Sequence, residues 1–121
     1  MKRDLELIRS IMVTIEEADS MQPFKLEFDD QSEEVINFHI LLLEEAGLIQ
    51  ANIESDETGE IILAEPIRLT WNGFEFLQNA RNESIWKKAI KTLGDKSISV
   101  SVSILSELLK SLIKETIGMH N

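Results

Sequence analysis

The sequence contains no cysteine and no long apolar run, and these two absences exclude several classes of protein. Without cysteine there is no disulfide framework, no thiolate nucleophile and no cysteine zinc site. The longest unbroken apolar runs, residues 40–43 and 61–64, fall far short of the ~20 residues that a membrane-spanning helix needs. The N-terminus is charged and leads into an amphipathic stretch, unlike the apolar core of a signal peptide. With 121 residues, the chain is expected to form one compact, soluble, cytoplasmic domain.

The sequence also lacks the short motifs of common enzyme classes. It contains no GxSxG, HExxH, GxxxxGK(S/T) or GxGxxG, so we expect no catalytic residue and no cofactor. The acidic residues between 29 and 34 do not have the spacing of an EF-hand loop and are interpreted as caps and a polar helix start. His39 has one further histidine available, His120, and a zinc site needs three or four ligands. We therefore expect no metal and interpret His39 as a polar or half-buried helix position.

Hydrophobic periodicity predicts an α+β fold. Helices are predicted where apolar residues recur at steps of three and four, at residues 4–18, 33–46, 70–80 and 82–93, the last continuing or restarting the one before it. Strands are predicted where apolar and polar residues alternate, at residues 24–28, 48–54 and 61–69. The last two strands form a hairpin around a polar turn. A final helix is predicted at residues 101–117, and whether residues 98–102 are strand or early helix stays open.

Two short motifs flank the predicted hairpin. Gly47-Leu48-Ile49 follows one helix, and Leu69-Thr70-Trp71-Asn72-Gly73 opens the next. Gly47 suits the left-handed stop at a helix C-terminus, Thr70 suits a helix cap, and Gly73 allows close packing. A helix, a GLI turn, a hairpin and an LTxxG turn in this order resemble a winged helix. In that fold the helix before the hairpin is the recognition helix, and the hairpin is the wing.

Longer stretches of the sequence resemble one family. These stretches are MKRDLELIR (residues 1–9), HILLLEEAGLI (residues 39–49) and RLTWNGFEFLQNAR (residues 68–81), followed by Trp86. Together they resemble the bacterial and phage family called domain of unknown function 2513. The resemblance implies a small winged-helix-like protein from bacterial chromosomes and prophages, and it implies no activity, cofactor or catalytic residue. The expected organisation is a winged-helix-like domain at residues 1–93, with a C-terminal helical extension at residues 94–121 that packs on it or forms a dimer seam.

Charge is distributed unevenly along the chain. The 22 acids and 12 bases give a formal net charge of −10, yet there is no lysine or arginine between Lys25 and Arg68, a span that holds 12 of the acids. This span contains the predicted recognition helix and the whole wing, and duplex DNA is bound by neutralising its phosphates with lysine and arginine. We therefore expect this face to repel DNA and to meet a basic protein partner. Its candidate partner-binding residues are Glu33, Glu34, Glu44, Glu45, Asp56 and Glu57.

The C-terminal third has the opposite balance, with seven bases against four acids in residues 81–121. Its candidate nucleic-acid contacts are Arg81, Lys87, Lys88 and Lys91. The spacing of Arg81, Lys88 and Lys91 is compatible with one helix face. The alternative, which we favour, is a solvated face that offsets the acidic remainder.

The two tryptophans also allow two interpretations, one as a nucleic-acid contact and one as part of the protein interior. Trp71 and Trp86 are of the type that stacks on nucleic-acid bases. They lie close in sequence to Phe74, Phe76 and Leu77, and we interpret them as part of a second hydrophobic cluster.

The last predicted helix carries a wide apolar stripe that includes Leu105, Leu108 and Leu112. This stripe is either the seam of a homodimer or cover for the first helix, and both readings stay open. The leading functional hypothesis is a non-enzymatic protein-interaction module with an acidic helix-and-wing face. The alternatives are a DNA-binding transcriptional regulator that uses the bases after Asn79 and, as a more distant third, an acidic DNA mimic.

Overall fold

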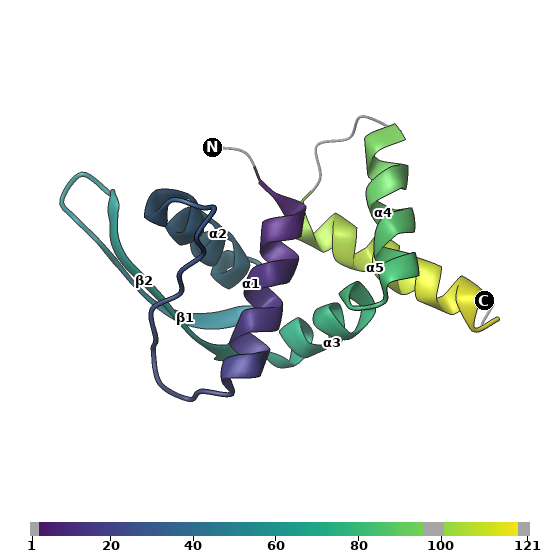
Figure 1. Ribbon diagram of the computed structural model, residues 1–121, viewed down its shortest axis with the longest axis horizontal. Helices are drawn as coiled ribbons and strands as arrows, with labels where there is room; N and C mark the ends of the chain where they lie inside the picture. The colour runs from purple at the N-terminus through teal and green to yellow at the C-terminus, as the bar shows by residue number, and fades with distance from the viewer. Residues whose placement is uncertain (1–2, 96–100, 119–121) are drawn as a thin grey trace. The chain divides into compact units, whose positions relative to one another are not determined.

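The computed structural model describes residues 3–95 and 101–118 and confirms the predicted α+β class (Figure 1). Its elements are, in chain order, α1 (Leu5–Ala18), α2 (Glu33–Glu45), β1 (Ile49–Ser55), β2 (Ile61–Leu69), α3 (Trp71–Ala80), α4 (Glu83–Asp95) and α5 (Val102–Thr116). Within the described residues, helices combined with one two-stranded antiparallel hairpin are consistent with a winged-helix-like domain. None of the described helices is long and apolar enough to cross a membrane. Most of the segment left open, residues 98–102, lies outside the described residues, and Val102 begins α5.

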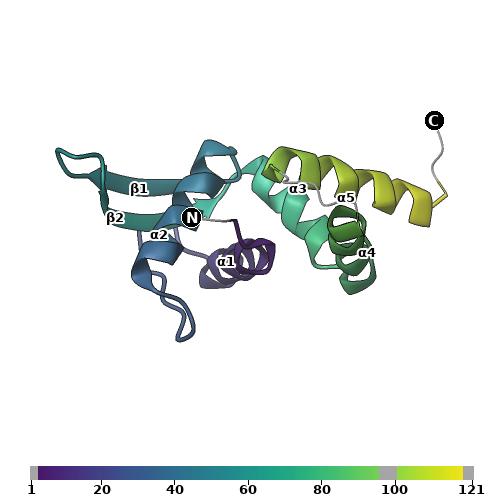
Figure 2. The same cartoon turned by 90° about the horizontal axis from the view of Figure 1, so that it is seen from above.

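The chain forms two compact units, Met1–Phe74 and Glu75–Asn121, so the boundary falls inside α3. In the first unit α1 and α2 pack on β2, and α2 also packs on β1. Figure 2 shows both helices beside the hairpin, whose tip extends past α2. In the second unit α4 packs against α5. The boundary expected near residue 93 lies within this second unit, and the division into a domain and an extension stays a prediction.

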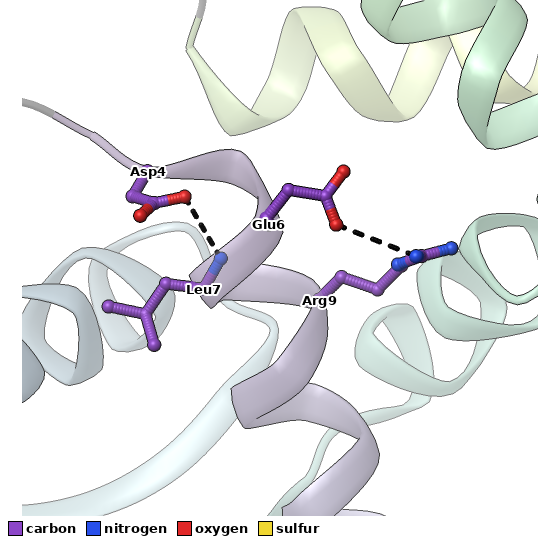
Figure 3. A network of polar contacts seen from close by, with 4 residues as sticks. All are labelled: Asp4, Glu6, Leu7 and Arg9. Atoms are coloured by element: carbon purple, nitrogen blue, oxygen red, sulfur yellow. Dashed lines mark hydrogen bonds and ion pairs between the residues drawn. The ribbon is translucent and has the colours of Figure 1, made fainter. Parts of the chain in front are cut away.

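The first helix begins with a side-chain cap. An Oδ1 atom of Asp4 accepts a hydrogen bond from the backbone N–H of Leu7 at 3.1 Å (Figure 3). Close to this cap, a guanidinium nitrogen of Arg9 lies 3.5 Å from a carboxylate oxygen of Glu6. The cap satisfies one of the N–H groups that a helix start leaves without an intrahelical partner. The buried face of α1 then follows the predicted spacing, with Leu7, Ile8, Ile11, Met12 and Ile15 all buried.

The second helix begins and ends where its sequence signals predict. The hydroxyl of Ser32 accepts a hydrogen bond from the backbone N–H of Val35 at 3.2 Å, so Ser32 is the N-cap of α2. Beyond the helix end, Gly47 has φ +75°, a conformation that costs glycine little. The chain turns there directly into β1, so three residues separate the end of α2 from the start of the wing.

The predicted strand at residues 24–28 is not formed. Burial alternates as predicted, with Leu26 buried and Lys25 and Glu27 exposed, but a single backbone hydrogen bond joins this segment to the hairpin, from the N–H of Phe24 to the carbonyl of Pro66 at 3.1 Å. The reciprocal bond of an antiparallel pair would need an N–H on Pro66, and proline has none. The segment is therefore irregular chain next to β2 and not a third strand.

The start of α3 is tied to the base of the wing. The hydroxyl of Thr70 donates to the carbonyl of Gly47 at 2.6 Å and accepts from the N–H of Gly73 at 3.1 Å. The backbone N–H of Thr70 donates to the carbonyl of Leu48 at 3.0 Å. This set of bonds, the Thr70 clasp, confirms Thr70 as a cap and joins the end of α2, the base of the hairpin and the start of α3.

The buried face of α3 differs from the predicted one. Trp86, Phe76 and Leu77 are buried as expected, but Trp71 is 77% exposed and Phe74 is 47% exposed. The buried positions of α3 are Gly73, Phe76, Leu77 and Ala80, a spacing of three and four that starts at Gly73. Trp71 lies on the opposite side of that stripe, so its assignment to a hydrophobic cluster is wrong.

Candidate functional site

The predicted acidic residues of α2 lie at its two ends. Glu33 and Glu34 are exposed in the first turn, while Glu44 is half-buried and Glu45 is exposed in the last. Nine residues of helix lie between the two pairs, and the rise from Glu34 to Glu44 is about 15 Å at 1.5 Å per residue. The acidic face therefore contains two separate charge clusters. Acids in the first turn also favour the helix, because they lie near the positive end of its dipole.

The N-terminal pair lies beside the wing, across an open groove of about 400 Å³. We call this the wing groove. It is lined by Glu33, Glu34, Asn37 and Phe38 of α2 and by Gly59, Glu60, Ile61 and Ile62 of the wing. Three of these side chains are carboxylates and three are large and apolar. The lining of the wing groove thus combines acidic and apolar side chains.

The tip of the wing is organised by Asp56. Its Oδ1 accepts hydrogen bonds from the backbone N–H and hydroxyl of Thr58, at 2.8 Å and 2.6 Å, and from the backbone N–H of Glu60 at 3.0 Å. Gly59 closes the turn with φ +86°. The Asp56 carboxylate is therefore engaged in the turn itself, while Glu57 next to it is exposed.

The same hydrogen bonds shift the pKa of the Asp56 carboxyl group at the tip of the wing. The hydroxyl of Thr58 is the largest influence and lowers the pKa of Asp56 from its ordinary value of 3.8. Desolvation is the next largest and opposes this shift, and the backbone N–H groups of Glu60, Thr58 and Gly59 lower the pKa further. Because the folded pKa is depressed, the contribution to the turn is present above pH 3.8 and is lost as the pH falls through the lower, folded value. We expect an NMR titration of the Asp56 carboxyl carbon to give a midpoint below 3.8. In Thr58→Val the midpoint should rise toward 3.8, and an unchanged midpoint would contradict the assignment.

The candidate nucleic-acid residues do not share one helix. Lys87, Lys88 and Lys91 are exposed on α4, but Arg81 lies in the turn between α3 and α4. The side chain of Asn82 accepts from the N–H of Ile85 at 3.0 Å and starts a new helix there. The expectation that Arg81 lies on one helix face with Lys88 and Lys91 is therefore wrong, while the three lysines do form an exposed basic surface.

His39 is fully buried and not half-buried. Its Nε2 accepts a hydrogen bond from the backbone N–H of Asp4 at 2.8 Å, and its Nδ1 lies 2.8 Å from the carbonyl of Val35. An N–H can only donate and a carbonyl can only accept, so this geometry uses a neutral ring with its hydrogen on Nδ1. The ring of Phe38 meets that of His39 edge to face at a centroid distance of 5.4 Å. Among the described residues, no group of three side chains is placed to hold a metal ion.

The apolar stripe of α5 is partly used within the chain. Leu105 is buried, and Leu108 and Leu112 are half-buried. The more exposed apolar side chains of this region are Ile104, at 52%, and Ile117, at 62%. The homodimer seam through Leu105, Leu108 and Leu112 stays a prediction.

Sequence reasoning missed Phe38, Glu60 and Ile62 as members of the site. A signal for Ile62 was present, because Ile61, Ile62 and Leu63 are three consecutive apolar residues of one strand. Neighbouring side chains of a strand point to opposite faces, so such a run must direct an apolar group away from the core. For Phe38 and Glu60 the contact across the groove is not local in sequence, and no local pattern indicates it.

Comparison with known proteins agrees with the resemblance noted in the sequence. The family model described as Hypothetical protein (DUF2513) matches residues 2–99. An "Uncharacterized protein" of Haemophilus influenzae (strain ATCC 51907 / DSM 11121 / KW20 / Rd) is 31% identical over 120 residues, which cover 98% of this chain and all of the relative. No solved structure matches the chain significantly. The chain therefore belongs to the DUF2513 family.

Proposed function

We propose that this protein is a non-enzymatic interaction module whose α2-and-wing face binds a basic surface on a protein partner. One observation carries the proposal: residues 26–67, which form α2 and the wing, contain 12 acids and no lysine or arginine. A winged helix that binds duplex DNA uses this region to neutralise phosphates. Here the same region has the sign that repels DNA and attracts cationic protein surfaces.

The test compares two variants with the same change in charge. The face variant reverses three exposed acids of α2 and the wing, by Glu45→Lys, Glu57→Lys and Glu60→Lys. The control variant reverses three exposed acids elsewhere, by Glu17→Lys, Glu107→Lys and Glu115→Lys. We expect the immobilised wild-type chain to retain a defined partner from cell extract at low salt. The face variant should lose that partner while the control variant retains it. Equal retention by both variants, or equal loss, would contradict the proposal.

A second candidate, a DNA-binding regulator, is favoured by the exposed lysines of α4. Fluorescence anisotropy of a labelled random duplex at about 20 mM and 200 mM salt separates the two, because non-specific DNA binding weakens by orders of magnitude over such a range. We expect no binding at either salt concentration. Salt-sensitive binding that is lost in Lys87→Glu, Lys88→Glu and Lys91→Glu would favour the regulator.

A further inference from the structure

The wing groove combines two features that a solvated acidic surface does not need. Carboxylates from two different elements, Glu33 and Glu34 of α2 and Glu60 of the wing, line the same hollow. None of the three makes an ion pair with another described residue. Carboxylates gathered at a concave surface make the local electrostatic potential strongly negative, and a cation that enters the hollow offsets it.

Part of the lining of the groove is apolar and exposed to solvent. Ile62 is 58% exposed although it belongs to a strand, and Phe38 lies half-buried beside it in the lining. The Phe38 ring also makes an edge-to-face contact with the ring of buried His39. An occupant that offered charge alone would leave this apolar surface uncovered.

These features restrict the kinds of molecule that the wing groove can bind. A metal ion would need three or more ligands in one place, and the described residues bring no such group together. A nucleic acid is negatively charged, as the groove is, and would be repelled. A volume of about 400 Å³ lies near the lower end of the ~300–1,000 Å³ typical of ligand clefts. It therefore accommodates a short segment and not a whole domain.

We infer that the wing groove binds a short segment of a partner protein that carries lysine or arginine next to a large apolar side chain. The cations lie at the rim, against Glu33, Glu34 and Glu60, and the apolar side chain packs on Phe38 and Ile62. This inference rests on the proposed function and names the site and the chemistry of the segment that is bound. An exposed charge pair alone contributes little to affinity, so selectivity comes from the combination with the apolar contact.

The probe is a fluorescent ten-residue peptide of alternating lysine and leucine, measured by anisotropy against the full chain. We expect Glu33→Gln with Glu34→Gln to weaken binding about fivefold to tenfold, which corresponds to two exposed ion pairs. The matched control is Glu107→Gln with Glu115→Gln, which removes two charges from exposed positions of α5, outside the acidic face. It should change the affinity about twofold or less. Circular dichroism checks that both variants keep their helix content.

A second matched pair of variants tests the apolar contact in the groove. Ile62→Thr should weaken binding about fivefold by removing apolar contact area, and Ile104→Thr, at another exposed isoleucine, should leave it unchanged. A peptide of alternating lysine and serine should bind several-fold more weakly than the lysine–leucine peptide.

Three outcomes would overturn the inference: no wild-type binding at about 20 mM salt, equal losses in the two glutamine pairs, or equal binding of the two peptides. The first outcome excludes the groove as the site, and the other two show attraction by net charge. None of them decides the proposed function, which is tested by partner capture with Lys variants. If the face variant loses its partner in that capture experiment and any of these three outcomes is also seen, the partner binds the acidic face outside the wing groove.

Discussion

Gly73→Ala is expected to lower the free energy of unfolding by roughly 3 kcal/mol, which corresponds to a fall in Tm of roughly 10 °C. A Cβ at this position would overlap the backbone carbonyl of Leu48 and contact the side chain of Leu69. The Leu48 carbonyl is part of a turn and already accepts from the N–H of Thr70, so it has little freedom to move away. Relief of the overlap would separate α3 from the base of the wing and break the Thr70 clasp.

Gly94 provides the matched control. It lies in α4, and an added Cβ would meet nothing within 4 Å. Gly94→Ala should therefore leave stability unchanged or raise it by up to about 1 kcal/mol, through the higher helix propensity of alanine. Thermal and urea unfolding followed by circular dichroism measure both variants. If Gly73→Ala were as stable as the wild type, the close approach of α3 to Leu48 would be wrong.

His39→Leu is expected to destabilise the protein by roughly 2 kcal/mol, although leucine is apolar and similar in size. The substitution removes both bonds of the ring and leaves the N–H of Asp4 and the carbonyl of Val35 without these partners. Since Asp4 is the N-cap of α1, the defect affects the start of that helix as well as α2. Glutamine at the same position has an acceptor at its tip, so His39→Gln should retain part of the lost stability.

Hydrogen exchange separates this effect from general loss of packing. The amide of Asp4 should exchange faster in His39→Leu than in the wild type, with a smaller change in His39→Gln. Amides in the middle of α4, a helix of the other unit, serve as the internal reference. An unchanged rate at Asp4 would show that its N–H does not depend on His39.

Features that depend on local chemistry were predictable from the sequence. The cap at Ser32, the positive φ of Gly47, the strand Ile61–Leu69 and the cap at Thr70 all follow from the residues next to them. A capping hydroxyl or a missing Cβ acts over three or four positions, and this is the range over which sequence patterns are informative.

The incorrect predictions concern relations between distant residues. The alternation at residues 24–28 is real, but pairing failed because of Pro66, which is remote in sequence. The exposure of Trp71 depends on which side of α3 meets the base of the wing, and that is decided at Gly73. The wing groove likewise depends on two segments more than twenty residues apart. For the acidic face the sequence revealed the sign of the charge, and the structure showed which apolar side chains line the groove beside it.

The Thr70 clasp also bears on how the first unit folds. It closes a contact between residues 23 positions apart, and that interval contains the complete hairpin. Loop closure over so short a stretch has a small entropic cost, and contacts of low sequence separation form early. We therefore expect the hairpin, the end of α2 and the first turn of α3 to form the folding nucleus of this unit, with α1 docking onto it later.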